Sequence, residues 1–216
     1  TILGFNSVDD MVLTIITFNF LFLGIFAVLT LKQAVSHESL ERLRLTSTGN
    51  PPELTLGDQK LWHLFLSHIW SSGQDQVAII KRKLNLALPG CNIFLDVDDM
   101  NDIGSIEEYV KASQCVLFFL SVGYFTSHNC LLELTTTLDQ QIPFVLVHER
   151  DEGKGGLPLE VCRASVQLPQ HAEALFDTGH EIVIWHRIFH FQQLSIKMIA
   201  EHLLHSTPIY EHLGVR

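Results

Sequence analysis

Apolar residues follow two patterns along this chain, and the first is a single unbroken run. Residues 11–31 comprise 21 amino acids and no charge. As an α-helix at about 1.5 Å per residue, the run would be about 31 Å long, the thickness of the hydrocarbon core of a bilayer. A buried core helix would carry a polar stripe, and a secretory signal would begin with basic residues instead of Asp9 and Asp10. The run therefore predicts one transmembrane helix.

The second pattern is a series of five short apolar runs in the remainder of the chain. Their first residues lie 24 to 39 positions apart, the length of a strand plus a crossover helix. The runs are nearly continuous, as expected of strands buried on both faces of a parallel sheet. They begin at Leu61, Cys91, Cys115, Ile142 and Glu181. The pattern predicts a small doubly wound α/β domain with a five-stranded parallel sheet.

The segments between these runs carry helical signals. Residues 74–88 place apolar side chains along one stripe, and residues 189–204 form the last helical segment. Ser105, with a Glu three residues later, forms a capping box at the start of another helix. Ser127 can cap a further helix, which contains Glu133.

The order of the two patterns predicts a membrane anchor followed by one globular domain. No Lys or Arg precedes the predicted helix in the sequence, whereas Lys32, Arg42 and Arg44 follow it. The positive-inside rule therefore predicts a single-pass membrane protein whose part after residue 31 lies in the cytosol. The expected divisions are an N-terminal flank at 1–10, the transmembrane helix at 11–31, a juxtamembrane linker at 32–58, the α/β domain at 59–206 and a C-terminal tail at 207–216.

The composition of the chain argues against a nucleic-acid partner and against a bound metal ion. The chain has 14 Lys and Arg against 24 Asp and Glu, a formal charge of -10, so a nucleic-acid surface is not expected. The four cysteines form no CxxC pair, and in a reducing cytosol they are expected to be free thiols. His186 and His190 are spaced like helical metal ligands, but no HExxH motif or matching acid accompanies them. We therefore predict no metal site.

Polar side chains follow three of the predicted strands. SHIW follows the first strand, DVDDMNDIG the second and SVGYFTSHN the third. Since doubly wound sheets bind ligands outside the carboxyl ends of their strands, these segments predict a pocket at that edge. Glu133 lies on the first turns of the helix after the third strand. It is either a helix residue that faces water or an acid in this pocket.

Three of these segments, in this order and spacing, resemble the TIR domain (Toll/interleukin receptor/resistance protein) family. LFLSH resembles its first box, CNIFLDVDDMNDIGSIEEYVKAS its second strand, BB loop and next helix, and VLFFLSVGYFTSHNCLLEL its third strand and following helix. The resemblance covers residues 59–204 and implies a flavodoxin-like sheet. It also implies signal transduction through association with other TIR domains, of the same chain or of different proteins. The implied interaction loop comprises Asp98, Asp99, Met100, Asn101, Asp102, Ile103 and Gly104.

Some members of this family cleave NAD+ with one glutamate in the helix after the third strand, and the pattern S-x-x-C-x-x-E places that residue at Glu133. By this resemblance NAD+ is a substrate, and no cofactor is bound permanently. The implied substrate-binding residues are Ser67, His68, Trp70, Asn129 and Cys130. The family commonly has Trp where this chain has Asn129, and Trp70 either compensates for it or is a buried anchor of the first loop. Other members are non-catalytic scaffolds, so a membrane-anchored TIR protein with or without NAD+ cleavage is expected.

Two further motifs have alternative interpretations. Asp96 and Asp98 form a D-x-D after an apolar strand, which also resembles the nucleophile motif of haloacid-dehalogenase-type phosphatases. The other magnesium ligands and the downstream Ser/Thr and Lys of that class have no convincing match, so this remains a minor alternative. GKGGLP at 153–158 lacks the spacing of a phosphate-binding P-loop and predicts a flexible surface loop.

Overall fold

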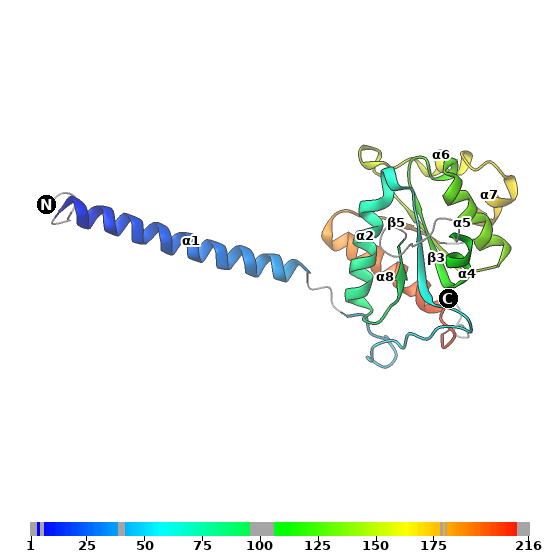
Figure 1. Ribbon diagram of the computed structural model, residues 1–216, viewed down its shortest axis with the longest axis horizontal. Helices are drawn as coiled ribbons and strands as arrows, with labels where there is room; N and C mark the ends of the chain where they lie inside the picture. The colour runs from blue at the N-terminus through cyan, green and yellow to red at the C-terminus, as the bar shows by residue number, and fades with distance from the viewer. Residues whose placement is uncertain are drawn as a thin grey trace. The chain divides into compact units, whose positions relative to one another are not determined.

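The computed structural model describes residues 4, 7–38, 42–95, 106–177, 179 and 181–210, and within 33–38 it describes the backbone alone. The chain divides into two compact units, Thr1–Leu40 and Glu41–Arg216 (Figure 1). One apolar helix makes up most of the first unit. A parallel sheet covered by helices makes up the second.

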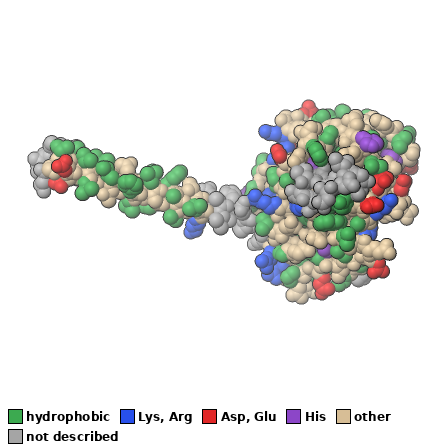
Figure 2. All heavy atoms as spheres, in the orientation of Figure 1, with side chains coloured by type: hydrophobic (Ala, Val, Ile, Leu, Met, Phe, Trp, Pro, Cys, Tyr) green, Lys and Arg blue, Asp and Glu red, His purple; other side chains and the backbone are tan. Residues whose placement is uncertain are grey.

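The first unit consists mainly of helix α1, Val8–Glu38. Residues 11–31 contain neither a charge nor a proline, so nothing interrupts the backbone hydrogen bonds of the helix. The stretch Val8–Lys32 is long and apolar enough to cross a membrane, and none of it is buried within the described part of the chain. Hydrophobic side chains cover the helix along its length (Figure 2). The helix extends beyond the predicted 11–31 at both ends and includes residues 32–38 of the predicted linker.

The second unit is built on a five-stranded sheet in the order β2-β1-β3-β4-β5. Every pair of neighbouring strands is parallel. The strands are β1 Trp62–Ser67, β2 Ile93–Phe94, β3 Ser113–Leu120, β4 Phe144–His148 and β5 Ile182–Ile184. Each coincides with one of the five apolar runs of the sequence, so the prediction of a five-stranded parallel α/β sheet is confirmed.

Helices cover both faces of this sheet. They are α2 Trp70–Ala87, α4 Ile106–Lys111, α5 His128–Asp139, α6 Leu159–Ala164, α7 Pro169–Phe176 and α8 Phe189–His205. α2 contacts α8 on one face, and α4 contacts α5 on the other (Figure 1). α2 begins four residues before the predicted start, and α8 begins where it was predicted. α6 and α7 were not predicted, because helices of six and eight residues are too short to show a clear period.

The core lies on both sides of the central strand β3. All of its residues from Cys115 to Leu120 are buried. Phe65 of β1 and Phe94 of β2 stack with their ring centroids 5.0 Å apart. Ser67, the last residue of β1, is in register with Phe118 of β3. The segments that follow these two strands therefore leave the sheet at the same edge, which is where a site was predicted.

The α/β unit extends beyond the predicted 59–206 at both ends. The Leu43 N–H donates to the Ala87 carbonyl at the end of α2 over 2.9 Å. The Glu53 N–H donates to the hydroxyl of the buried Tyr210 over 2.8 Å. Parts of the predicted linker and of the predicted C-terminal tail are thus bound to the α/β unit.

All four cysteines are free thiols, as predicted, and all are buried. Burial raises the pKa of the Cys91 and Cys115 thiols from 9.0 to about 12, and that of Cys162 to about 11. Because the thiolate is the reactive form, we expect the folded chain to react very slowly with a thiol-specific disulfide reagent at neutral pH. All four thiols should react quickly once concentrated urea unfolds the protein. Rapid labelling of the folded chain, followed by its absorbance change, would contradict this prediction.

Candidate functional site at the carboxyl edge of the sheet

Glu133 is a buried acid, 4% exposed, on the sheet-facing side of α5. Cys130, Leu134 and Thr137 share this buried side, because residues three and four apart lie on the same face of a helix. Ser127 begins the helix as predicted, since its Oγ accepts a hydrogen bond from the Cys130 N–H over 3.4 Å. The interpretation of Glu133 as a residue that faces water is therefore wrong.

The Glu133 carboxylate accepts a hydrogen bond from Ser67, the last residue of β1. The fully buried Ser67 donates its hydroxyl proton to Glu133 Oε2 over 2.5 Å. The two residues are 66 positions apart and meet because β1 lies next to β3, which leads into α5. A buried carboxylate without a hydrogen-bond donor is strongly unfavourable, so this bond both stabilises and orients the acid.

Tyr124 extends this contact into a chain of three polar groups. It lies in the short 3-10 helix η2, Tyr124–Thr126, and its hydroxyl is hydrogen-bonded to Ser67 Oγ. Burial raises the pKa of the Tyr124 hydroxyl well above its usual range, and the nearby Cys130 and Glu133 add to the shift. The phenol thus keeps its proton and donates it to Ser67, which in turn donates to Glu133. Tyr124 was not predicted as a site residue, although it lies in the SVGYFTSHN segment after the third strand.

A pocket opens beside Glu133. Its volume is about 300 Å³, at the lower end of the range for small-molecule sites. It is lined by His68, Ile69, Trp70, Ser71, Ser127, Asn129 and Glu133. The loop after β1, the first turn of α2 and the first turns of α5 therefore meet around one carboxylate.

The predicted substrate-binding residues gather at this pocket in two layers. His68, Trp70 and Asn129 line it. Ser67 and Cys130 are buried next to lining residues, and the Cys130 thiol donates to the His68 carbonyl over 3.3 Å. Trp70 is 59% exposed, so its interpretation as a buried anchor of the first loop is wrong. The physical reason is that α2 begins at Trp70, and its ring projects from the first helical turn instead of folding under a loop.

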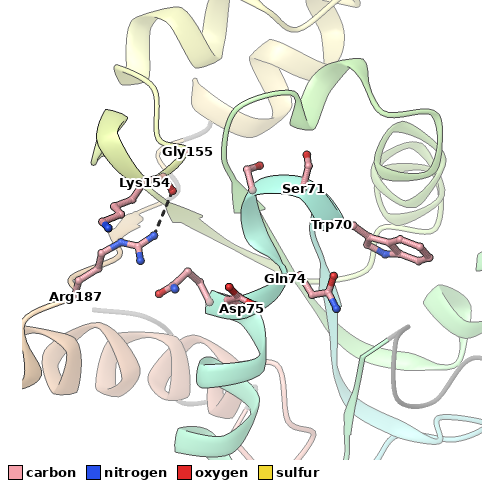
Figure 3. Close-up of a pocket in the computed structure, with 9 residues that line it drawn as sticks. Trp70, Ser71, Gln74, Asp75, Lys154, Gly155 and Arg187 are labelled. Carbon is pink, nitrogen blue, oxygen red and sulfur yellow. Dashed lines mark hydrogen bonds between the residues drawn. The ribbon is translucent and has the colours of Figure 1, made fainter.

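A second pocket lies beside the same turn of α2. Its volume is about 390 Å³, and it shares Trp70 and Ser71 with the pocket of Glu133. Figure 3 shows Lys154 and Arg187 on one side of this second pocket, Asp75 projecting from α2, and Trp70 pointing away from the two cations. The two pockets therefore lie on either side of the start of α2.

One of the two positive charges of the second pocket, that of Arg187, already has a carboxylate partner. Arg187 donates to Glu149 Oε2 through Nη2 over 2.7 Å and through Nε over 3.0 Å. Its Nη2 also reaches the Lys154 carbonyl at 3.3 Å (Figure 3). Asp75 lines the same pocket as Lys154. The pocket of Glu133 is the stronger candidate, because a buried carboxylate lines it and its described lining residues include no Lys or Arg.

The GKGGLP segment is hydrogen-bonded to the residues that follow β3 and β4. The Val122 N–H donates to the Gly155 carbonyl over 2.8 Å, and the Gly156 N–H donates to the Asp151 carbonyl over 2.9 Å. Gly156 is buried, and a Cβ added there would lie 2.5 Å from the Glu149 carbonyl. The prediction of a flexible surface loop is wrong at Gly156, because this close approach of two backbones requires glycine.

Several predicted residues lie outside the described part of the chain. These are Asp96 and Ser105 and the whole interaction loop of Asp98, Asp99, Met100, Asn101, Asp102, Ile103 and Gly104. The D-x-D alternative, the capping box and the role of the loop thus stay predictions. Within the described ranges, no group of three or more His, Cys, Asp or Glu is arranged to hold a metal ion.

The chemistry that this arrangement supports is stabilisation of positive charge. Among the described residues that line its pocket, Glu133 is the one carboxylate, so these residues do not include a pair of acids for general acid–base catalysis. No protein-family model matches the chain, and no curated protein matches it. The features of the chain that bear on its function are therefore its fold, the pocket and the environment of Glu133.

Proposed function

We propose that the chain is a membrane-anchored TIR-domain protein that signals through association with other TIR domains and cleaves NAD+ at Glu133. The observation that carries the proposal is the buried Glu133 carboxylate, bonded to Ser67 and facing a pocket at the carboxyl edge of the sheet. The strand order 2-1-3-4-5, which is that of flavodoxin-like folds, supports the TIR assignment. The apolar helix α1 supports the anchor, and Lys32, Arg42 and Arg44 favour a cytosolic α/β unit.

One carboxylate is sufficient for this reaction. The bond that breaks joins the ribose carbon C1′ to the nicotinamide nitrogen, and its electron pair leaves with nicotinamide. Nicotinamide is a pyridinium before cleavage and departs neutral, so no acid is needed to protonate it. The ribose is left as an oxocarbenium-like cation, which a carboxylate in a dry pocket stabilises. Water then adds its oxygen to C1′ and releases a proton, which gives ADP-ribose.

The residues around Glu133 suit a nicotinamide riboside. The Trp70 ring offers an aromatic face for stacking, in place of the tryptophan that the family commonly has at the position of Asn129. The Asn129 carboxamide and the Ser71 hydroxyl offer hydrogen bonds to the ribose or the amide. Neither group carries a charge that would compensate the Glu133 carboxylate.

A non-catalytic scaffold is the alternative, and a surface of exposed apolar side chains favours it. Ile184 lies on β5, which is an edge strand, and Ile188, Phe191 and Leu194 lie at the start of α8. These side chains are between 37% and 66% exposed. Ile188 and Phe191 line one pocket, and exposed apolar side chains beside an edge strand can take part in protein association without any role for Glu133.

The test uses the full chain reconstituted into liposomes. We expect the protein to resist alkaline extraction from the vesicles and to convert NAD+ into nicotinamide, followed by chromatography. A folded chain that stays in the membrane without any turnover would overturn the enzymatic part of the proposal and favour the scaffold.

Ser67 and Tyr124 are expected to position Glu133. Ser67→Ala removes the donor to Glu133 Oε2, so we expect kcat for NAD+ cleavage to fall by about 10- to 100-fold while KM changes little. Tyr124→Phe removes the next hydroxyl in the chain, and the loss in kcat should be smaller. Initial rates over a range of NAD+ concentrations separate kcat from KM.

Tyr210→Phe is the matched control for the tyrosine variant. It also removes a phenolic hydroxyl that takes part in one hydrogen bond, to the Glu53 N–H, but Tyr210 is not among the residues that line the pocket. Equal losses in kcat for the two tyrosine variants would show a general effect on folding and contradict a positioning role for Tyr124.

A further inference from the structure

Asn19 is a polar side chain in the middle of an apolar helix. The stretch of α1 that is long enough to span a membrane is Val8–Lys32, and its centre is residue 20. Asn19 therefore lies within about 1.5 Å of the midplane of a bilayer crossed by this stretch. It is the one carboxamide between residues 8 and 32.

The hydrogen-bonding needs of Asn19 differ from those of the nearby threonines. The Thr17 hydroxyl donates to the Leu13 carbonyl over 2.8 Å, and the Thr30 hydroxyl donates to the Phe26 carbonyl over 2.9 Å. Each threonine thus uses its one hydroxyl proton in a hydrogen bond within its own helix. The Asn19 carboxamide has two N–H groups and an acceptor oxygen, and its bond to the Ile15 carbonyl, 2.9 Å long, uses one N–H.

Hydrocarbon cannot supply the bonds that remain. A second N–H and the Oδ1 oxygen of Asn19 are not used in the bond to Ile15. Lipid tails offer neither a donor nor an acceptor, so exposing these groups to them is unfavourable. None of the Val8–Lys32 stretch is buried within the described protein. A partner for Asn19 at this depth must therefore come from another transmembrane segment.

We propose that α1 associates with the α1 of a second copy of this chain through reciprocal Asn19–Asn19 hydrogen bonds at the centre of the bilayer. A carboxamide is both donor and acceptor, so two of them can satisfy each other across a two-fold axis. A parallel pair of identical helices places both Asn19 residues at the same depth. Ile15, Ile16, Phe22 and Leu23, three and four positions away, flank Asn19 on the same face and can pack around the pair.

This inference rests on the membrane anchor of the proposed function and extends it. Two α1 helices held together bring their two α/β units to a high effective concentration. Weak contacts between the domains, such as those proposed for TIR association, would then form within one dimer instead of depending on encounters in the membrane.

The test measures dimerisation of the full chain in liposomes by energy transfer between donor- and acceptor-labelled copies, as the protein-to-lipid ratio is varied. We expect a dimer whose dissociation constant rises by about 3- to 30-fold for Asn19→Leu. Thr17→Leu is the control, because it also removes a polar group from α1 but one that is bonded within the helix. Its dissociation constant should stay within about twofold of that of the original chain.

Each other outcome counts against the inference in a different way. Equal dissociation constants for the original chain and Asn19→Leu, or a monomeric original chain, would overturn it while leaving the anchor and the enzymatic proposal intact. A chain that alkaline extraction removes from the vesicles would overturn the anchor and this inference together. NAD+ turnover does not enter the readout, so its absence would affect the enzymatic proposal alone.

Discussion

Glu133→Gln is expected to lower kcat for NAD+ cleavage by about 10²- to 10³-fold, the range found when one electrostatic stabiliser is removed from an active site. Glutamine has the same shape as glutamate and an oxygen that can still accept the Ser67 proton, so the fold and the pocket should persist. The variant loses the negative charge that faces the developing ribose cation. The measurement is the initial rate of nicotinamide release by the full chain in liposomes.

Asp139→Asn is the matched control for this variant. It removes one carboxylate charge from the same helix, but Asp139 is exposed in the last turn of α5 and does not line the pocket. The control should retain the rate of the original chain. If Glu133→Gln also retained that rate, Glu133 would be a structural acid bonded to Ser67, and the chemistry proposed for the pocket would be wrong.

The strands of this protein were predictable because burial on both faces leaves a strong signal. In β3, Ser113–Leu120, the six residues from Cys115 onward are all apolar, and an unbroken apolar run of this length is typical of a strand buried on both faces of a parallel sheet. The helices were predictable where an N-cap or a long stripe marks them, as Ser127 does for α5. Short helices such as α6 and α7 show neither signal.

The environment of Glu133 was not predictable from its neighbours in sequence. Leucines at 131, 132 and 134 surround it, so helical periodicity allowed both a buried and an exposed position. The deciding partner, Ser67, is 66 residues away and meets Glu133 through strand order. A sequence pattern records local spacing, whereas this contact depends on which strands are neighbours.

The position of the Tyr124 side chain was also not predictable from the sequence, because it depends on the backbone conformation of Gly123. Gly123 before it has a φ of +86°, a conformation that glycine adopts without strain. A Cβ at this position would also lie 2.9 Å from the Ile69 side chain. The turn that this glycine permits places the Tyr124 hydroxyl next to Ser67. The sequence identified the segment as polar and close to the site, but it did not indicate which of its side chains points inward.

The ion pair between Glu149 and Arg187 was also not predicted from the sequence. Glu149 follows β4 and its side chain is 1% exposed, while that of Arg187, after β5, is 28% exposed. A second Glu149 oxygen accepts the Asp151 N–H over 2.9 Å. One buried carboxylate therefore joins the segments that follow two neighbouring strands.

Arg187→Met is expected to lower the free energy of unfolding by about 3 kcal/mol, toward the lower end of the range for breaking a buried ion pair because Arg187 is partly exposed. Methionine keeps much of the apolar stem but leaves the Glu149 charge buried without its cation. Urea unfolding followed by tryptophan fluorescence measures the change. All three tryptophans, Trp62, Trp70 and Trp185, lie in the α/β unit, so the signal reports on that unit and not on α1.

The chain offers a matched control in a second ion pair of nearly equal length. Arg163 and Asp177 are 2.6 Å apart, against 2.7 Å for Arg187 and Glu149, but their side chains are 50% and 39% exposed. Because water screens exposed pairs, Arg163→Met should change the free energy of unfolding by less than about 1 kcal/mol. Equal losses for the two variants would show that burial of Glu149 is not the cause.

Arg187→Met could lower stability because the contacts of the arginine are lost, or because the Glu149 charge is left buried without a cation. The double variant Glu149→Gln/Arg187→Met distinguishes these two causes. Glutamine is neutral and keeps an oxygen for the Asp151 N–H, so the double variant contains no buried charge at this position. We therefore expect it to be more stable than Arg187→Met alone, although it carries one more substitution. If the double variant were less stable than Arg187→Met, the loss would come from the missing contacts of the arginine itself, and the Glu149 charge would not be what Arg187 compensates.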